Sequence, residues 1–258
     1  MVGYPQRVGV EPTPSDSAAS ELIDPYVQSQ VGTTCGNLYK SVIGRLDRYP
    51  IPSFPLSGSG DLLDIGCGWG RWTISAARAG FRAVGLDPEP DFVAAAERVA
   101  AQLDVGPRFV VGESARLPFD ESSFDVVFSF SVLQHLTSAN NTQTFEEIRR
   151  VLRPGGVAMV QLANSWGAWN AFRSRRLQSV PMLYYSPREM RRLGGIVGST
   201  RLEPDAYFTL NGQRSDLRLL PPVARGVVMI SEALRHAARV LPIGQFADSV
   251  WVVARRPD

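Results

Sequence analysis

The segment LLDIGCGWGRW, residues Leu62–Trp72, contains residue types that can hold a ligand through the main chain. Asp64 is followed by Gly66, Gly68 and Gly70 at every second position. Glycine tolerates left-handed backbone conformations and has no side chain, so a ligand can approach the peptide groups closely. A glycine loop that leads from a strand into a helix also presents N–H groups at the helix N-terminus, which favours polar and anionic ligand groups. We therefore expect a cofactor to bind here.

Two classes of cofactor, nicotinamide dinucleotides and S-adenosylmethionine, bind glycine loops of this kind. The dinucleotide fingerprint is G-x-G-x-x-G. Here the third glycine comes one residue early, and Arg71 takes the last position of the pattern. Asp87 ends the next apolar run, 21 residues after Gly66, and an acid at that place can accept hydrogen bonds from ribose hydroxyls. Both cofactors contain ribose, so Asp87 leaves the choice open.

His135 is the candidate for proton transfer, because it comes just after the predicted strand 123–130. An imidazole with an ordinary pKa near 6.5 is neutral at cellular pH and can remove a proton from an acceptor hydroxyl. The alternative is a structural role, in which His135 packs against or caps the next short helix. The second histidine, His236, is interpreted as a surface or interface residue, and Cys67 as a packing residue. No spacing of His and Cys fits a zinc site, so no metal is predicted, and an oxygen-ligated magnesium ion stays an open alternative.

The elements that must position these residues alternate between short apolar runs and amphipathic segments. Apolar strands separated by amphipathic helices are typical of a parallel sheet that is covered on both faces. The predicted fold is α/β, with a doubly wound, mostly parallel seven-stranded sheet and helices on both faces. The predicted strands are 61–66, 82–87, 107–112, 123–130, 155–164, 201–210 and 247–256, and the predicted helices are 71–80, 88–103, 141–152, one that begins at Ser186 in a capping box with Glu189, and 222–241.

The domain organisation follows from changes in composition along the chain. The predicted division is a Pro- and Ser-rich mobile tail at 1–20, an N-terminal cap and connector at 21–60, and a core at 61–258. The cap is expected to be helical in pieces, with an interruption near Gly32–Gly36. Two insertions in the core, at about 165–185 and 211–245, lie where α/β proteins bind ligands. We interpret them as lids or dimer contacts that select the acceptor.

The composition indicates one globular domain, since the 258 residues are 44% hydrophobic and 20% charged. Two cysteines, no signal-peptide pattern and no run of 18 apolar residues predict a soluble, cytoplasmic protein with no transmembrane segment. The formal net charge is only +2, but residues 165–258 contain 14 arginines against 7 acidic residues. This arginine excess is either a solvated surface or a contact with an anionic partner.

Four segments in order, LLDIGCGWG, VGLDPEP, VVGESARLPFDESSFDVVFSFSVLQHL and VLRPGG, break the tie between the two cofactors. Over Asp61 to about Asn164, and more loosely to the last predicted strand, the chain resembles the class I S-adenosylmethionine-dependent methyltransferases. The resemblance implies S-adenosyl-L-methionine as the cofactor of the glycine loop and a Rossmann-like fold.

The resemblance also implies roles for particular residues. Gly66, Gly68 and Gly70 would border the aminoacyl part of the cofactor, and Asp64 would orient the loop and the amino group. Asp87 would hold the ribose hydroxyls, and the residues that would start the helix beneath the base are Pro88 and Glu89.

Further roles come from the later segments of the resemblance. Glu113 and Ser114 would meet the adenine, although relatives often carry an aspartate at the position of Glu113. Ser129 would offer its backbone carbonyl, and His135 would stand at the reaction centre. Relatives carry a cofactor lid at the position of TTCGNLYK, residues 33–40. The candidate lid or substrate residues are Asn37 and Tyr39 in this segment and Tyr26 before it. A plain N-terminal cap is the alternative for these three.

The predicted function is O-methylation of a hydroxyl on a small molecule. Aromatic clusters among arginines and amides, NSWGAWN, MLYYS and DAYF, suggest a sugar or glycolipid-like acceptor. The alternatives are C- or N-methylation of a quinone, lipid or other secondary metabolite, an RNA methyltransferase, and a non-catalytic cofactor-binding partner. The core lacks the Asn/Asp-Pro-Pro-aromatic run of DNA amino methyltransferases, so no DNA partner is expected. A homodimer built on the apolar helix 222–241 is a further interpretation.

Overall fold

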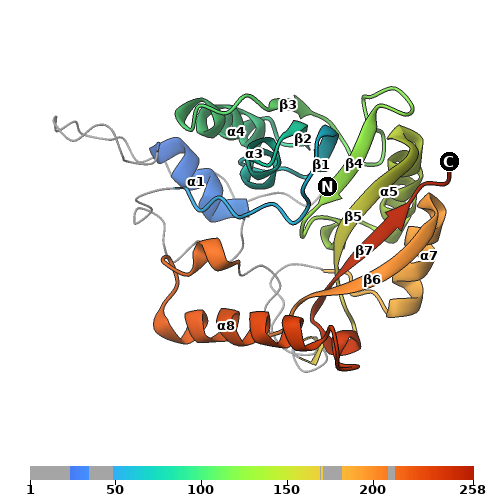
Figure 1. The fold of residues 1–258 in the computed structure, drawn as a ribbon. Helices are drawn as coiled ribbons and strands as arrows, with labels where there is room; N and C mark the ends of the chain where they lie inside the picture. Colours follow the sequence, from blue (N-terminus) through green and yellow to red (C-terminus); the bar gives the residue numbers. More distant parts are fainter. Residues whose placement is uncertain (1–23, 35–48, 169, 171–181, 209–212) are drawn as a thin grey trace.

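A computed structural model gives the fold, and it describes residues 24–34, 49–168, 170, 182–208 and 213–258 (Figure 1). A seven-stranded sheet in the order β3-β2-β1-β4-β5-β7-β6 forms the centre of the molecule. The strands are β1 Gly60–Ile65, β2 Phe81–Asp87, β3 Arg108–Val111, β4 Phe124–Ser129, β5 Leu152–Ala163, β6 Ser199–Ala206 and β7 Ser249–Arg255. The predicted α/β fold with a mostly parallel seven-stranded sheet is confirmed.

The strand directions define where a ligand can be expected. The pairs β1–β2, β2–β3, β1–β4 and β4–β5 are parallel, whereas β7 runs antiparallel to both of its neighbours, β5 and β6. The chain leaves β1 for β2 on one side and returns to β4 on the other. Such a switch in strand order opens a crevice at the carboxyl ends of the strands, which is the usual ligand site of open α/β sheets.

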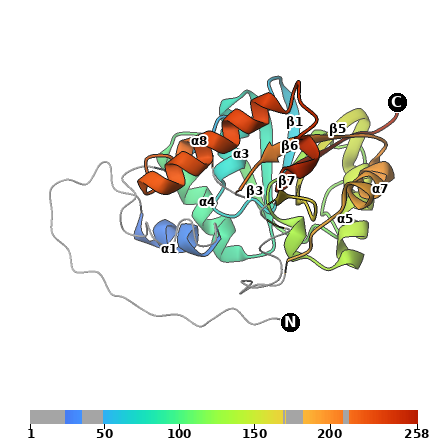
Figure 2. The same cartoon turned by 90° about the horizontal axis from the view of Figure 1, so that it is seen from below.

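Helices cover both faces of the sheet, as Figures 1 and 2 show from two directions. One face carries α3 and α4, with α1 packed on α4, and the other face carries the packed pair α5 and α7. A further helix, α8, crosses the molecule at the end to which β4 and β5 point (Figure 1). The helix bounds are α1 Pro25–Thr34, α3 Arg71–Arg78, α4 Pro90–Gln102, α5 Ser138–Val151, α7 Pro187–Val197 and α8 Pro222–Ala237.

Burial of both sheet faces explains why the central strands are apolar along their whole length. On the α5–α7 side, Leu63 and Ile65 of β1 pack in one cluster with Phe145 and Ile148 of α5. On the other side, Leu62 lies in a second cluster that is rich in aromatic rings. The ring centroids of Trp72 and Phe130 are 4.9 Å apart, and those of Phe130 and Trp251 are 5.8 Å apart.

Local sequence signals located several helix ends correctly. Ser186 Oγ accepts from the N–H of Glu189 at 3.3 Å, and the Glu189 carboxylate accepts from the N–H of Ser186 at 2.7 Å, so the predicted capping box is confirmed. α1 continues through Gly32 and its described part ends at Thr34, within the range Gly32–Gly36 where an interruption is predicted, and the rest of that range lies outside the described residues. The tail at 1–20 lies outside the described residues.

The boundaries of several elements differ from the prediction by two to four residues, as β5 and α8 illustrate. β5 begins at Leu152 and runs through Pro154, because its first residue pairs with Phe124 of β4 before a register shift. α8 ends at Ala237, four residues earlier than expected, where the chain continues in turns. Within the described residues, no helix has both the length and the apolar character needed to cross a membrane.

Candidate functional site

The glycine loop between β1 and α3 has the conformation that its sequence predicts. Gly66, Gly68 and Gly70 have φ angles of 74°, 51° and 83°, all in the left-handed region that favours glycine. The N–H groups of Gly66 and Cys67 donate to the carbonyl of Leu86 at 2.7 and 3.0 Å, which ties the loop to the end of β2. A Cβ on Gly66 would lie 2.4 Å from the side chain of Val132. The protein's own packing therefore requires this glycine, in addition to any ligand.

Asp87 is buried at the carboxyl end of β2, directly beside the glycine loop. Its Oδ2 accepts from the N–H of Gly68 at 2.9 Å, and its Oδ1 accepts from the N–H of Glu89 at 3.1 Å. Burial raises the pKa of this carboxyl, and the two backbone hydrogen bonds act against that rise. Because each carboxylate oxygen has two lone pairs, both oxygens keep the capacity to accept from a ligand hydroxyl.

Asp64 lies in β1, buried below the loop. Its Oδ2 accepts from Oγ1 of Thr73 at 2.7 Å. Burial raises the pKa of Asp64 to about 7, and the nearby charge of Asp87 adds to the rise. Asp64 thus fixes the first turn of α3, and with it the exit of the glycine loop. Sequence analysis missed Thr73, whose only signal was a hydroxyl residue in the helical turn that follows the loop.

The segment after β3 closes over the end of β2. The N–H of Gly112 donates to the carbonyl of Asp87 at 3.0 Å. Glu113 is exposed and forms an isolated antiparallel bridge with Arg116. The hydroxyl of Ser114 is 3.0 Å from Oγ1 of Thr144 in α5, so this side chain contacts the neighbouring helix. The two predicted adenine residues therefore follow the strand next to Asp87 with their side chains in different surroundings.

The carboxyl end of β4 lies next to the glycine loop. Ser129 is fully buried, and its hydroxyl donates to the carbonyl of Ile65 at 3.0 Å, which joins the ends of β4 and β1. Two residues later, Ser131 has a φ of 61°, a left-handed conformation that is uncommon outside glycine. Its Oγ accepts from Nε2 of Gln134 at 2.7 Å. These contacts fix the backbone that leads to His135.

His135 ends a short 3-10 helix, Leu133–His135, just beyond β4. The residue is exposed, yet surrounding protein removes enough water from the imidazole to lower its pKa. The hydroxyl of Thr137 caps the following helix, α5, by accepting from the N–H of Asn140 at 3.2 Å. Thr137 therefore provides the side-chain cap of α5, and the catalytic and packing roles of His135 both stay predictions.

A buried ion pair links the glycine loop to the segment before α8. Nη2 of Arg71, at the start of α3, lies 2.7 Å from Oδ1 of Asp216 and 2.8 Å from Oγ of Ser215. Both members of the ion pair are buried. Sequence analysis noted Arg71 only as a departure from the dinucleotide pattern. Its partner was beyond prediction because the two residues are 145 positions apart.

Of the three predicted lid or substrate residues, the structure describes Tyr26. The hydroxyl of Tyr26 donates to the carbonyl of Asp91 at 3.0 Å, and the guanidinium of Arg98 lies 4.5 Å from the centre of its ring. Both contacts join α1 to α4, as an N-terminal cap would. Asn37 and Tyr39 lie outside the described residues.

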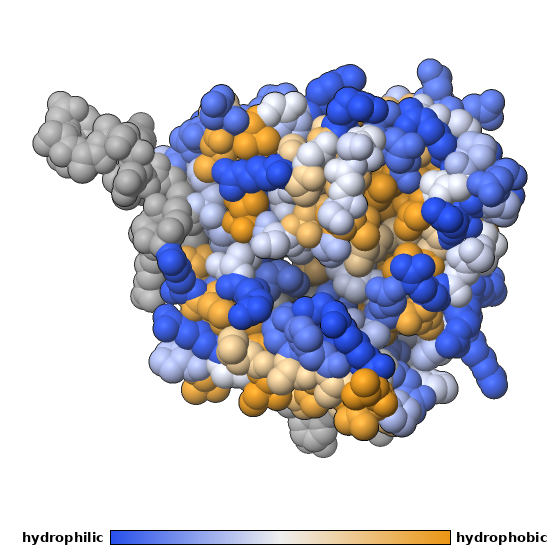
Figure 3. Space-filling view, viewed as in Figure 1, coloured by the Kyte–Doolittle hydropathy of each residue, from blue (hydrophilic) through white to orange (hydrophobic). Residues whose placement is uncertain are grey.

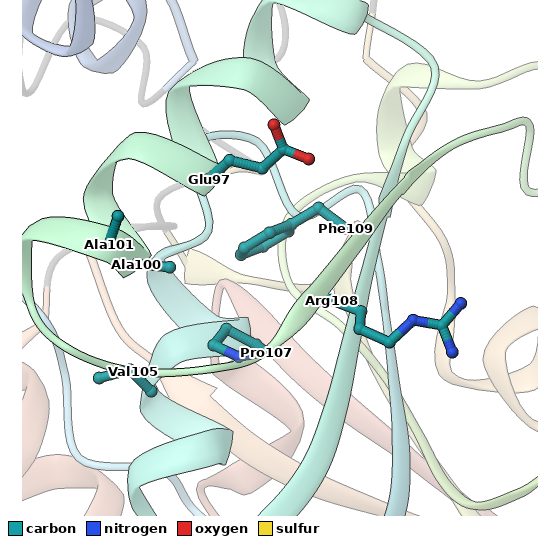
Figure 4. A pocket seen from close by; sticks show the side chains of 7 residues that line it. All are labelled: Glu97, Ala100, Ala101, Val105, Pro107, Arg108 and Phe109. Atoms are coloured by element: carbon teal, nitrogen blue, oxygen red, sulfur yellow. The ribbon is translucent and has the colours of Figure 1, made fainter.

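A groove of about 380 Å³ between α4 and β3 lies away from this site. Figure 4 shows its lining, which includes Glu97, Val105 and Phe109. The groove is at the amino end of β3, whereas Gly112 and Asp87 lie at the carboxyl ends of their strands. Among the residues that the structure describes, no group of three or more His, Cys, Asp or Glu side chains is arranged to hold a metal ion.

Comparison with known proteins connects this geometry to a family. Residues 62–156, which include the glycine loop, Asp87 and His135, match a family model described as a methyltransferase domain. An uncharacterized methyltransferase of Synechocystis is 32% identical over 128 residues, which are 48% of this chain and 58% of that protein. The 2-methyl-6-phytyl-1,4-hydroquinone methyltransferase of Synechocystis is 32% identical over 133 residues, 51% of this chain and 38% of that protein.

A solved structure shares the fold over a longer stretch. The magnesium protoporphyrin IX methyltransferase of Synechocystis, with bound SAH, superposes with a TM-score of 0.53 at 15% identity, covering 90% of this chain and 85% of that one. The chain thus spans about three fifths or less of the two curated relatives, and the structural likeness concerns the fold alone.

Proposed function

We propose that this chain, in which residues 62–156 match a methyltransferase domain, is a class I, Rossmann-like methyltransferase that transfers the methyl group of S-adenosyl-L-methionine to a small-molecule acceptor. The observation that carries this proposal is Asp87. Its buried carboxylate is held by the N–H groups of Gly68 and Glu89 and keeps acceptor capacity on both oxygens. It stands at the carboxyl end of β2, beside the glycine loop, where a ribose would lie.

The cofactor would be held mainly by main-chain groups. The left-handed loop Gly66–Gly70 would border the aminoacyl part, and Asp64 would act by holding α3 and, through its charge, would favour the cofactor's amino group. Asp87 would accept hydrogen bonds from the ribose hydroxyls. The proposed remaining contacts are Pro88 and Glu89 beneath the base, Glu113 and Ser114 at the adenine, and the carbonyl of Ser129. Because the hydroxyl of Ser114 lies against Thr144, its adenine contact would come from the backbone.

When bound, the cofactor supplies a methyl group on a positively charged sulfur, so the carbon is already activated for displacement. The protein must then align the acceptor atom with that methyl group, exclude water, and accept the proton that a hydroxyl acceptor loses. We propose that His135, at the carboxyl edge of the sheet, accepts this proton. Burial lowers its pKa, which favours the neutral imidazole that can take a proton.

For the acceptor we propose a hydroxyl compound, of the sugar or glycolipid-like class. Its support is the exposed Trp166 and the half-buried Tyr184 among the arginines after residue 164. Two other aromatic residues of the same clusters serve the fold: Tyr185 is buried against Asn141, and the hydroxyl of Tyr207 donates to the carbonyl of Ile243 at 3.2 Å.

A second candidate function is methylation of a flat or lipid-like acceptor at carbon. Two observations favour it. The half-buried Phe130 directly follows Ser129 and stacks with Trp72 and Trp251, which supplies an apolar wall beside the site. One relative described above is named for a hydroquinone and the structural neighbour for a porphyrin.

Isotope labelling separates these functions. The purified chain is incubated with methyl-labelled S-adenosyl-L-methionine and sugars, glycolipids, quinols or RNA, and labelled products are identified by mass spectrometry. Hydrolysis of the new bond in base indicates a methyl ester, and otherwise the mass-spectrometric fragment that carries the label shows whether carbon, nitrogen or an ether oxygen was methylated. Tight binding of NAD by calorimetry, with none of S-adenosyl-L-methionine, would contradict the whole proposal. Cofactor binding without turnover on any acceptor would favour a non-catalytic partner.

A further inference from the structure

Helix α8 turns an apolar stripe toward solvent. Helical geometry puts Val223, Gly226, Ile230 and Ala233 on one stripe, three or four residues apart, and all four are exposed. Val223 has 82% of its surface accessible. The large exposed apolar side chains on the helix and the turn that follows are Val223, Met229, Ile230, Val240 and Leu241.

α8 is apolar on two sides: Val228 is buried and Leu234 packs against the core, while the stripe described above faces solvent. Ser231 is buried, and its hydroxyl accepts from the N–H of Tyr207 at 2.9 Å. Glu232 and Arg235 form an ion pair of 2.8 Å and are only partly exposed. A surface helix of a water-exposed protein normally carries charged or polar residues on the side opposite its buried apolar face. An exposed apolar face of this kind marks an interaction surface.

The figures agree on where this face lies. In Figure 2, which views the molecule from below, α8 runs across the front with no labelled element over it. Figure 3 shows hydrophobic surface gathered along the lower edge of the molecule, where Figure 1 places α8.

The charges around the face are positive. Arg214, Arg218, Arg225 and Arg239 are exposed, and no carboxylate pairs with them among the described residues. The two acidic residues of 213–246 form ion pairs with other arginines: Asp216 pairs with Arg71, and Glu232 pairs with Arg235. A second copy of the chain would bring the same arginines and no matching acids to this face. The surface that would complement this face of α8 is an apolar layer bordered by negative charge.

We propose that α8 docks this protein on the surface of an anionic lipid bilayer. The apolar stripe would enter the boundary between headgroups and acyl chains, and the surrounding arginines would bind lipid phosphates. Because Arg71 and Asp216 tie the segment before α8 to the helix after the glycine loop, docking would bring the carboxyl edge of the sheet close to the lipid surface. The proposal needs neither cofactor nor acceptor, so its test is independent of methyl transfer.

The test is flotation of the full chain with vesicles of phosphatidylcholine alone or with phosphatidylglycerol added. We expect binding only to the anionic vesicles, weakened by salt. Val223→Glu should lower the partition coefficient between vesicles and solution roughly tenfold or more, because it puts a charge in the stripe that would enter the bilayer. The matched control is Ala101→Glu on α4, where the alanine is exposed at the amino end of β3, away from the docking face, and it should bind like the unchanged chain.

The electrostatic part has its own pair of variants. Arg218→Glu with Arg239→Glu should also weaken binding roughly tenfold, whereas Arg188→Glu with Arg191→Glu on α7 should not. Thermal melting checks that each variant is folded. Equal binding to neutral and anionic vesicles, equal losses for test and control variants, or no vesicle binding would overturn the proposal. The proposal would also be overturned if light scattering showed a dimer that Val223→Glu dissociates and the chain bound no vesicles. That outcome would assign the face to a second copy of the chain.

Discussion

At the scale of single residues, Asp87 is the side chain on which cofactor affinity should depend most. Asp87→Ala removes charge-assisted hydrogen bonds to the ribose worth roughly 1.5–3 kcal/mol. We therefore expect the Kd for S-adenosyl-L-methionine, measured by calorimetry, to rise by about 10- to 150-fold. The control is Glu97→Ala, an acid in the groove between α4 and β3. A loss of affinity in the control instead would move the cofactor to that groove.

Asp64 should make the stability of the protein depend on pH in an unusual direction. Its pKa is about 7 in the folded protein, above the ordinary value of 3.8. Between these two values the folded state holds a proton that the unfolded state has lost. Stability therefore falls as pH rises through this window, by on the order of 4 kcal/mol, and the loss is complete above pH 7.

Asp64→Asn removes that titration while its side-chain oxygen can still accept from Thr73. Urea unfolding of both proteins from pH 4 to pH 8 should show a free-energy advantage for the variant that grows up to about pH 7 and then stays constant. An advantage that is the same at every pH would mean that Asp64 is charged in the folded protein throughout.

His135 should affect turnover and spare cofactor binding. If it is the base, His135→Ala lowers kcat by about 10²–10⁴-fold with a nearly unchanged Kd for the cofactor. Burial lowers the pKa of this imidazole, so in the free enzyme the acid limb of the pH–rate profile should have its midpoint below 6.5. A variant that keeps near-normal kcat from pH 6 to 9 would leave His135 with a structural role only.

At the scale of elements, the buried pair Arg71–Asp216 should hold the segment before α8 against α3. Arg71→Met leaves the Asp216 carboxylate buried without this partner and should lower the free energy of unfolding by about 3–5 kcal/mol. A second change, Asp216→Leu, should recover part of the loss. The comparison is Arg201→Met in the exposed pair with Glu203, which should cost at most about 1 kcal/mol. Urea unfolding measures all of these changes, and equal costs at the two sites would contradict the role of the buried pair.

How much of this was predictable depends on sequence distance. Periodic apolar runs predicted all seven strands, and the capping box at Ser186 predicted the start of α7, because both signals are local. The packing of Val132 against Gly66 and the bond from Thr73 to Asp64 required the folded sheet. The apolar pattern of α8 predicted a helix but not that its stripe faces outward, since that depends on which neighbours the fold supplies.

At the scale of the whole molecule, S-adenosyl-L-methionine should stabilise the fold by mass action. Its site joins β1, β2, β3 and β4, so the unfolded chain has no equivalent site. At a ligand concentration 100 times Kd, the free energy of unfolding should rise by about 2.7 kcal/mol. Thermal melting detects this as a higher Tm, and NAD at the same concentration serves as the control. An equal shift with NAD would mean that the glycine loop does not distinguish the two cofactors.

The position of β7 has a consequence for the order in which the molecule is assembled during synthesis. β7 comes after β6 in the chain but lies between β5 and β6, where Trp251 pairs with both Gln161 and Glu203. A nascent chain therefore holds β5 with an open edge, and β6 with no neighbour, until the ribosome has made β7. If the messenger RNA is degraded or the ribosome stalls before β7 is made, the released chain has unpaired strand edges. Such edges readily pair with other chains. The sheet is therefore complete only when β7 has inserted between β5 and β6.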